Sequence, residues 1–207
     1  MKSIKNKWKE INYLKSIEKE LQAIANKQPV IEDSDLSGIV IGPLSTIDIL
    51  KKNYLYQSTL VRVNLSYSNI AGSISESNLL EVNFEKSNLN RCTMFKSNIK
   101  HSNFSMAKII ASLDDAIFEN CNFKDAKIMG GTYGYEYGGR RTTFCNCDFT
   151  NAVFKNVEFR ASKFIHCNFT NTKFIKCDLR GMKIEGEINL NPSQFESMEL
   201  PDALKSV

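Results

Sequence analysis

A large apolar side chain returns every five residues from Leu60 to Ile184, and a small residue lies two positions before it. Neither the helical period of about 3.6 residues nor the strand period of about 2 explains this spacing. Repetition at one fixed short period is typical of a solenoid. The pattern therefore predicts a chain that bends at each repeat, with the large and the small side chain inside and the other three outside.

The repeat can be counted through the chain, and all 25 central positions are apolar or aromatic. They fall at Leu60, Leu65 and Ile70, then at every fifth residue from Ile74 to Ile109, from Leu113 to Tyr133 and from Phe144 to Ile184. A narrow interior with room for one large and one small residue on each side explains the alternation.

The repeats also share a polar residue before the centre, as in Ser77-Asn78-Leu79, Ser102-Asn103-Phe104 and Cys167-Asn168-Phe169. This pattern resembles the pentapeptide-repeat family. The resemblance implies an all-β solenoid, a right-handed quadrilateral β-helix with four repeats in each 20-residue coil. Residues 20 apart then stack about 4.8 Å from each other. We expect Phe144 to stack with Phe164, Phe149 with Phe169 and Phe154 with Phe174.

Three segments follow from where the repeat starts and stops. Residues 1–55 are predicted to be a helical cap and lead-in, residues 56–190 the β-helix, and residues 191–207 a C-terminal cap or tail. Apolar residues spaced by three and four predict one amphipathic helix over residues 4–25, either a cap or a partner-binding helix. An isolated early repeat at 34–36, a short helix at 46–52 and a capping box at Pro192-Ser193 and Glu196 are further expectations.

Six cysteines raise the question of a disulfide or a metal site. Five of them occupy the small inward position of a repeat, where a thiol fills space like a small apolar group. We therefore expect buried thiols rather than a ligand cluster, with Cys145 alone at an outward position.

The repeat fails at residues 130–141, where eleven residues separate Tyr133 from Phe144. Either one step carries a six-residue insertion or two steps contain a bulge. Glycine, tyrosine and arginine are concentrated here, and the latter two are enriched at binding hot spots. The segment is thus either a structural bulge or a partner-binding loop, and the candidate binding residues are Tyr133, Tyr135, Tyr137, Arg140 and Arg141.

No catalytic, cofactor or metal residues are expected. The histidines His101 and His166 stand alone at outward positions, and the sequence has no phosphate-binding loop or nucleophile motif. A convex rod also lacks the concave pocket that small molecules need. We therefore expect a protein that is not an enzyme.

Residues 56–190 hold 17 Lys and Arg against 13 Asp and Glu, a mildly basic balance that falls short of a nucleic-acid footprint. Two candidate basic faces stand out, either binding faces or ordinary solvated ones. One is expected to carry Lys155, Lys173 and Lys176, and an adjacent face Lys163 and Lys183.

These observations predict a cytoplasmic, non-enzymatic rod that offers flat faces and the 130–141 loop to an unidentified protein partner. No apolar run is long enough to span a membrane, and no signal peptide is recognisable. The resemblance adds an alternative, a Qnr-like protein that binds DNA gyrase and protects it from quinolones. A DNA mimic needs an acidic surface, and this chain is net positive. The family also suggests a homodimer through the C-terminal tail.

Overall fold

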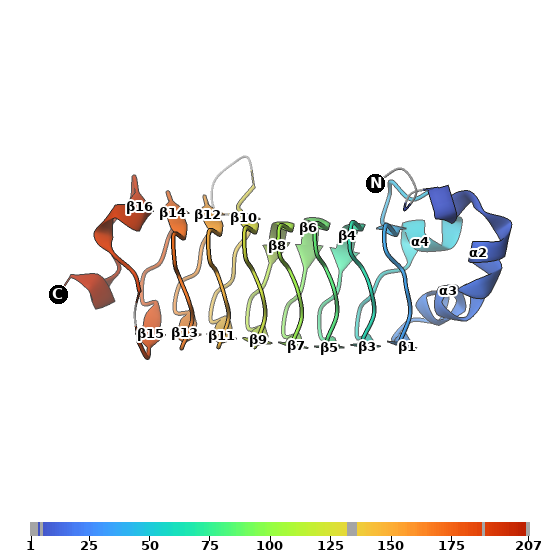
Figure 1. Cartoon of the computed structure of the whole chain (residues 1–207), viewed down its shortest axis with the longest axis horizontal. Coiled ribbons are helices and arrows are strands. Elements are labelled where there is room, and N and C mark those ends of the chain that lie inside the picture. Colours follow the sequence, from blue (N-terminus) through green and yellow to red (C-terminus); the bar gives the residue numbers. More distant parts are fainter. Residues whose placement is uncertain (1–3, 5, 132–135, 188, 206–207) are drawn as a thin grey trace.

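The computed structural model describes residues 4, 6–131, 136–187 and 189–205, which form an elongated rod (Figure 1). Helices lie at the N-terminal end and the tail lies at the other. Between them, two parallel β-sheets follow opposite sides of the rod along its length. We call them the odd sheet and the even sheet, after the numbers of their strands.

Each sheet has eight strands, arranged along the rod in the order of the chain. The odd sheet contains β1 (Val30–Glu32), β3 (Thr59–Val61), β5 (Asn78–Leu80), β7 (Asn98–Lys100), β9 (Ile117–Glu119), β11 (Thr143–Cys145), β13 (Lys163–Ile165) and β15 (Lys183–Glu185). The even sheet contains β2 (Val40–Ile41), β4 (Asn69–Ser73), β6 (Asn88–Thr93), β8 (Lys108–Ser112), β10 (Lys127–Met129), β12 (Val153–Lys155), β14 (Lys173–Ile175) and β16 (Phe195–Glu196). Isolated bridges close the two remaining sides, as between Asn83 and Asn103 and between Glu158 and Asp178. Each coil therefore has four sides, as the resemblance implied.

The core is a set of stacked columns, one for each side of the coil. Phe144 pairs with Phe164 and Phe154 with Phe174 in the strand register, with ring centroids 4.9 and 4.8 Å apart. Phe149 and Phe169 stack at 5.5 Å. These three predicted pairs are confirmed, and all six rings are at most 1% exposed.

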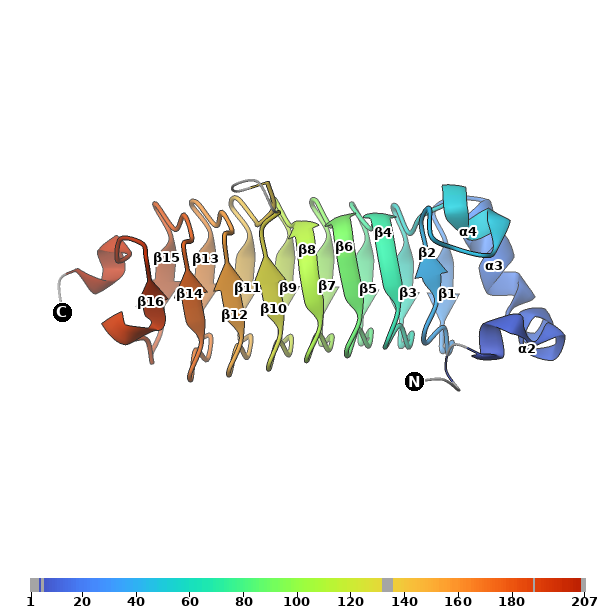
Figure 2. The same cartoon turned by 90° about the horizontal axis from the view of Figure 1, so that it is seen from above.

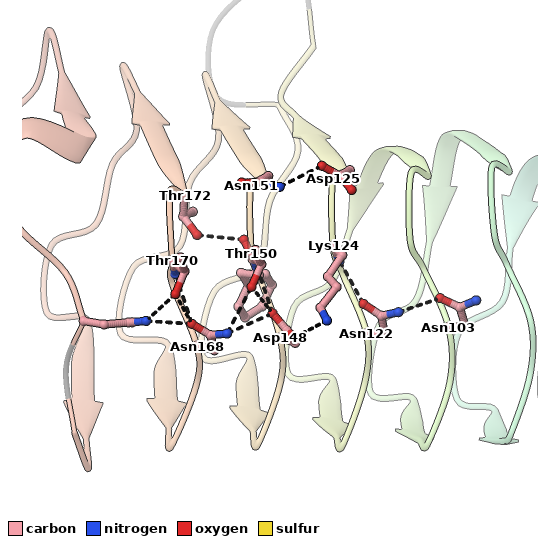
Figure 3. Close-up of polar contacts among 12 residues, drawn as sticks. Asn103, Asn122, Lys124, Asp125, Asp148, Thr150, Asn151, Asn168, Thr170 and Thr172 are labelled. Atoms are coloured by element: carbon pink, nitrogen blue, oxygen red, sulfur yellow. Dashed lines mark hydrogen bonds and ion pairs between the residues drawn. The ribbon is translucent and has the colours of Figure 1, made fainter.

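A ladder of polar side chains follows the side between the two sheets (Figure 3). The Asn122 amide donates to Asn103 Oδ1 at 3.2 Å, and Asn168 donates to Asp148 Oδ1 at 3.3 Å. Lys124 adds an ion pair to Asp148 at 3.1 Å. On this side of the coil, the polar residue before the centre thus links neighbouring coils through side-chain hydrogen bonds, which explains why Asn and Asp recur there.

The corners of the coil need a left-handed backbone. Residues two places after a centre, such as Glu81, His101 and Asn146, have φ values of 55°, 51° and 53°. Their amides donate to carbonyls of the next coil, as from His101 to Glu119 at 2.9 Å. Asn and Asp tolerate this conformation best among non-glycine residues, so their frequency at corners of the C-terminal half has a backbone cause.

The predicted single helix over residues 4–25 is wrong, because the segment is broken. A 3₁₀ turn at Lys7–Lys9 is followed by α2 (Ile11–Ser16) and α3 (Glu18–Ala25). Glu10, between the 3₁₀ turn and α2, is extended, and Ile17, between α2 and α3, lies outside helical geometry. The breaks let the chain fold over the end of the solenoid. Trp8 Nε1 donates to the Ser37 carbonyl at 2.9 Å and Ile24 is fully buried, whereas Ile11 is 70% exposed.

The solenoid begins earlier than residue 56. β1 pairs with β3 and β2 with β4, and Asp35 bridges to Asn64, so the early repeat at 34–36 belongs to the first coil. The expected helix at 46–52 is present as α4 (Asp48–Lys52). It buries Leu50 completely and interrupts that first coil between β2 and β3.

The long step at residues 130–141 is a six-residue insertion into one side of one coil. Ile128 is a regular centre paired with Phe154, and the next centre is Gly139, because Gly138 bridges to both Ser112 and Glu158. Eleven residues therefore span a step that normally takes five. The predicted centre at Tyr133 lies outside the described residues. At Gly139, a glycine takes the position of a large apolar residue.

The tail begins with a 3₁₀ turn, Pro192–Gln194, whose capping box is formed by Asn191 and Gln194 rather than by Glu196. β16 then adds a last strand, and the Phe195 ring stacks on Phe174 at 5.0 Å. A second 3₁₀ turn, Asp202–Leu204, follows. The C-terminal segment therefore continues the core column before it covers the end. A homodimer through this tail stays a prediction.

Candidate interaction surfaces

The insertion leaves the even sheet directly after Met129, and its first residue must be glycine. A Cβ on Gly130 would lie 1.7 Å from the Asn156 carbonyl oxygen of the next coil. The Gly130 amide donates to the Lys155 carbonyl at 2.9 Å. The first root of the insertion is thus held against the neighbouring coil by its backbone.

Two ion pairs hold the other root. Arg141 donates two hydrogen bonds to the Asp115 carboxylate, both 2.6 Å long. These bonds lower the pKa of Asp115 below its ordinary value. Arg140 pairs with Glu158 at 3.1 Å and donates its backbone amide to Asp114 at 2.9 Å. Both arginines of the predicted binding loop are therefore anchors, although about half of each side chain remains exposed.

Of the three candidate tyrosines, Tyr133 and Tyr135 lie outside the described residues. Tyr137 is half-buried, and its carbonyl accepts a hydrogen bond from the Glu158 amide at 3.3 Å. The described part of the loop therefore joins the rod at fixed points on either side of the insertion.

Arg140 begins a ladder of arginines 20 residues apart, on the side closed by isolated bridges. Arg160 pairs with the nearly buried Glu158, and Arg180 pairs with Asp178 at 2.6 Å. The hydrogen bond from Arg180 lowers the pKa of Asp178. Because carboxylates alternate with the arginines, this side is highly charged and close to neutral.

The lysines of the two predicted basic faces lie on opposite sides of the rod, not on adjacent ones. Lys155 and Lys173 are on strands of the even sheet, with Lys176 at the corner after β14. Lys163 and Lys183 pair with each other in the odd sheet. The reason is that ten residues correspond to two sides of a four-sided coil.

The structure adds two lysines that the sequence interpretation missed. Lys108 and Lys127 are direct partners on β8 and β10 of the even sheet, and both are exposed. The signal was hidden because the four-residue step from Ile109 to Leu113 separates these two lysines, and the eleven-residue step from Ile128 to Gly139 separates them from Lys155.

The thiols lie where the repeat predicts. Cys92, Cys121, Cys147, Cys167 and Cys177 are buried, and Cys145 is the partly exposed one. Burial raises the pKa of Cys92 to about 12 and that of Cys177 to about 11. Such thiols stay protonated and are poor nucleophiles near neutral pH.

The described residues hold no group of three or more His, Cys, Asp or Glu side chains placed to bind a metal ion. His101 and His166 are exposed, at left-handed corners of different coils. No helix in the described ranges is both long and apolar enough to cross a membrane. A hollow of about 410 Å³ lies between the last coil and the tail, lined by residues that include Arg180, Met198 and Lys205.

Comparison with known families matches the repeats directly. The model for pentapeptide repeats matches residues 144–181 in eight copies. This part of the chain is identified as pentapeptide repeats. None of the curated proteins compared with it matches.

Several solved structures of pentapeptide-repeat proteins are similar to this chain, at low sequence identity and with TM-scores below 0.5. A trypsin-treated form of QnrB1, a plasmid-mediated fluoroquinolone resistance protein, is 10% identical with a TM-score of 0.48, covering 76% of this chain and 82% of that one. Full-length QnrB1 is 12% identical with a TM-score of 0.42, covering 81% and 90%. HetL, from the cyanobacterium Nostoc and involved in regulating heterocyst differentiation, is 10% identical with a TM-score of 0.23, covering 76% and 85%.

Proposed function

We propose that this protein is a non-enzymatic interaction rod that presents its flat faces and the 130–141 loop to a protein partner. The anchoring of the insertion carries the proposal. A solenoid can close its coil in five residues at this side, yet here it takes eleven without losing register on either side. Both roots are fixed, by Gly130 against Asn156 and by Arg141 against Asp115.

The chemistry of the described surface supports a binding role over a catalytic one. Burial raises the pKa of the Cys92 and Cys177 thiols, and the exposed histidines stand on separate coils. The charged side built from Arg140, Glu158 and Arg160 satisfies its own charges. Such an arrangement favours a rigid scaffold that binds a partner over an active site that activates a substrate.

The geometry favours this reading over a gyrase-binding DNA mimic. A protein that replaces DNA must offer carboxylates where the enzyme expects phosphates. The even sheet instead exposes Lys108, Lys127 and Lys155. We therefore treat DNA gyrase as an alternative partner that an assay must test.

Affinity capture from the native cell tests the proposal. The bait is the whole chain, compared with a variant in which Tyr135, Tyr137, Arg140 and Arg141 are changed to alanine. Arg160→Ala is the matched control, because it also removes an ion pair of Glu158 but leaves the insertion intact. The proposal predicts a protein that is retained by the wild type and by the control and lost from the loop variant. A set of captured proteins that is identical for all three baits contradicts it.

A further inference from the structure

Figure 2 shows the strands of the even sheet side by side along the rod. Their register places the outward-facing side chains of this sheet in two columns that run along the rod. Column one, at the first residue of each strand, contains Val40, Asn69, Asn88, Lys108, Lys127, Val153 and Lys173 in unbroken register. Column two, two residues later, contains Ile110 on β8 and then Met129, Lys155, Ile175 and Glu196 in register. A basic column thus lies beside a mainly apolar one.

Among the described residues, three of the four lysines of this surface lack a carboxylate partner. From β8 to β16 the two columns hold four lysines and one carboxylate, Glu196, which lies 3.5 Å from Lys173. Within the described ranges, Lys108, Lys127 and Lys155 form no ion pair, and all three are exposed. Elsewhere along the rod some lysines do have a carboxylate partner, as Lys100 has in Glu119 on the odd sheet at 2.8 Å.

The spacing of the columns indicates the shape of a matching partner. An α-helix lying along the rod returns a side chain to the same face every 5.4 Å or so, while strands are about 4.8 Å apart. The mismatch is roughly 0.6 Å per strand, or about 2 Å from β8 to β14, which flexible lysine side chains absorb. An extended peptide in this direction repeats every ~6.8 Å and loses register by about 2 Å at each strand.

The two columns also match two neighbouring rows of a helix. They are separated by two residues along a strand, about 6.7 Å, and adjacent rows on a helix surface are about 5–6 Å apart. At β12 the columns exchange character, with Val153 in column one and Lys155 in column two. This exchange specifies one register, because the partner must exchange an acidic and an apolar residue at the same level.

From these relationships we infer that the even sheet between β8 and β14 docks an acidic amphipathic helix of a partner protein. Its carboxylates lie over Lys108, Lys127, Lys155 and Lys173, and its apolar row packs on Ile110, Met129 and Ile175. The half-buried apolar column distinguishes this surface from a phosphate-binding one, which would leave those side chains without a partner. The inference rests on the proposal that the rod binds proteins, and it adds a second surface with a stated chemistry.

A synthetic peptide of about five helical turns tests the inference. It carries Glu along one row and Leu along the next, with one exchange placed to match β12. A peptide of the same composition with both rows scrambled is its control. Binding is measured by fluorescence anisotropy and helix formation by circular dichroism, with a 20-base-pair DNA duplex and anionic phosphatidylglycerol vesicles as parallel probes.

Two charge-reversed variants of the full chain make the test specific. K108E/K127E changes an adjacent pair on the even sheet, and K163E/K183E changes the equivalent adjacent pair on the odd sheet. The inference predicts that the patterned peptide becomes helical on the wild type. Its affinity should fall about tenfold or more in K108E/K127E and change less than about twofold in K163E/K183E. Thermal unfolding of both variants checks that the rod is intact.

Three results overturn the inference: equal loss of affinity in both variants, equal binding of the scrambled peptide, or no binding of the patterned peptide. DNA or vesicles that bind more tightly than the peptide, through Lys108 and Lys127, would reassign the surface to phosphate recognition. If the peptide fails while the loop variant still loses its captured partner, the interaction function survives and only this surface is wrong.

Discussion

Gly139 lies directly beneath Phe159, at the position where every other complete coil places a large side chain. The Gly139 amide donates to the Glu158 carbonyl at 2.7 Å, and a Cβ on Gly139 would lie 2.9 Å from the Phe159 ring. The Phe159 ring also lies against Phe144, with the two ring centroids 5.9 Å apart. The phenylalanine thus fills the space that the insertion leaves without a large side chain.

Gly139→Ala should therefore destabilise the rod by about 1–3 kcal/mol, the usual range for overpacking a core. The new methyl would also lie 2.1 Å from Thr142 Oγ1, which is held by its hydrogen bond to the Leu113 carbonyl. Chemical denaturation measures the effect. Adding Phe159→Leu should recover part of the loss, so the two changes should be less costly together than their sum. Additive costs would mean that the two residues do not share this space.

Thiol labelling of the native protein should be fastest at Cys145. The other five cysteines are buried, and burial raises the pKa of Cys92 to about 12, so they react only when the coil opens. An aromatic disulfide reagent should show one fast equivalent followed by slow ones. The fast phase should vanish in Cys145→Ser; its persistence would show that another thiol is accessible and that the inward register is wrong.

The ion pair at the root of the loop should be visible in a carboxyl titration. Hydrogen bonds from Arg141 lower the folded-state pKa of Asp115, so the pair contributes stability above the unfolded-state pKa and loses it as pH falls through the folded value. Arg141→Gln should move the Asp115 pKa back toward its ordinary range in a ¹³C NMR titration. The stability difference between variant and wild type should be present at neutral pH and disappear in acid. An unchanged Asp115 pKa would show that the pair does not form in solution.

A supercoiling assay with DNA gyrase addresses the alternative partner. At micromolar protein, with or without a quinolone, we expect neither inhibition of supercoiling nor protection of the enzyme. The lysines exposed on the even sheet oppose the acidic character that a DNA mimic needs. Protection that depends on the 130–141 loop would instead identify this chain as a topoisomerase-binding rod.

The repeat predicts the core of this fold because each coil reproduces the same local constraint. Any residue such as Phe144 has a partner 20 positions away in an unbroken stretch, so pairs like Phe144 and Phe164 follow from counting. Counting fails where the chain leaves the coil. The breaks at Glu10 and Ile17, the start at Val30 and the centre at Gly139 depend on contacts between segments that are distant in sequence.

The surfaces were harder to predict than the core for the same reason. Lys108, Lys127 and Lys173 form one column, but their spacings in the sequence are 19 and 46 residues. The short step before Leu113 and the insertion after Ile128 both shift the count. Likewise, the sequence shows Arg140 and Arg141 near tyrosines. Only the structure shows that Arg140 forms an ion pair with Glu158, and Arg141 with Asp115.

Site-specific photo-crosslinking in the native cell tests the central claim, that the rod binds a protein partner through defined surfaces. A photoreactive amino acid is placed at Tyr137 beside the loop, at Met129 on the even sheet, or at the exposed Ile117 on the odd sheet. We expect one reproducible crosslinked protein from Tyr137 or Met129 and none from Ile117. The same weak crosslinks from all three positions, or none from any, would contradict it.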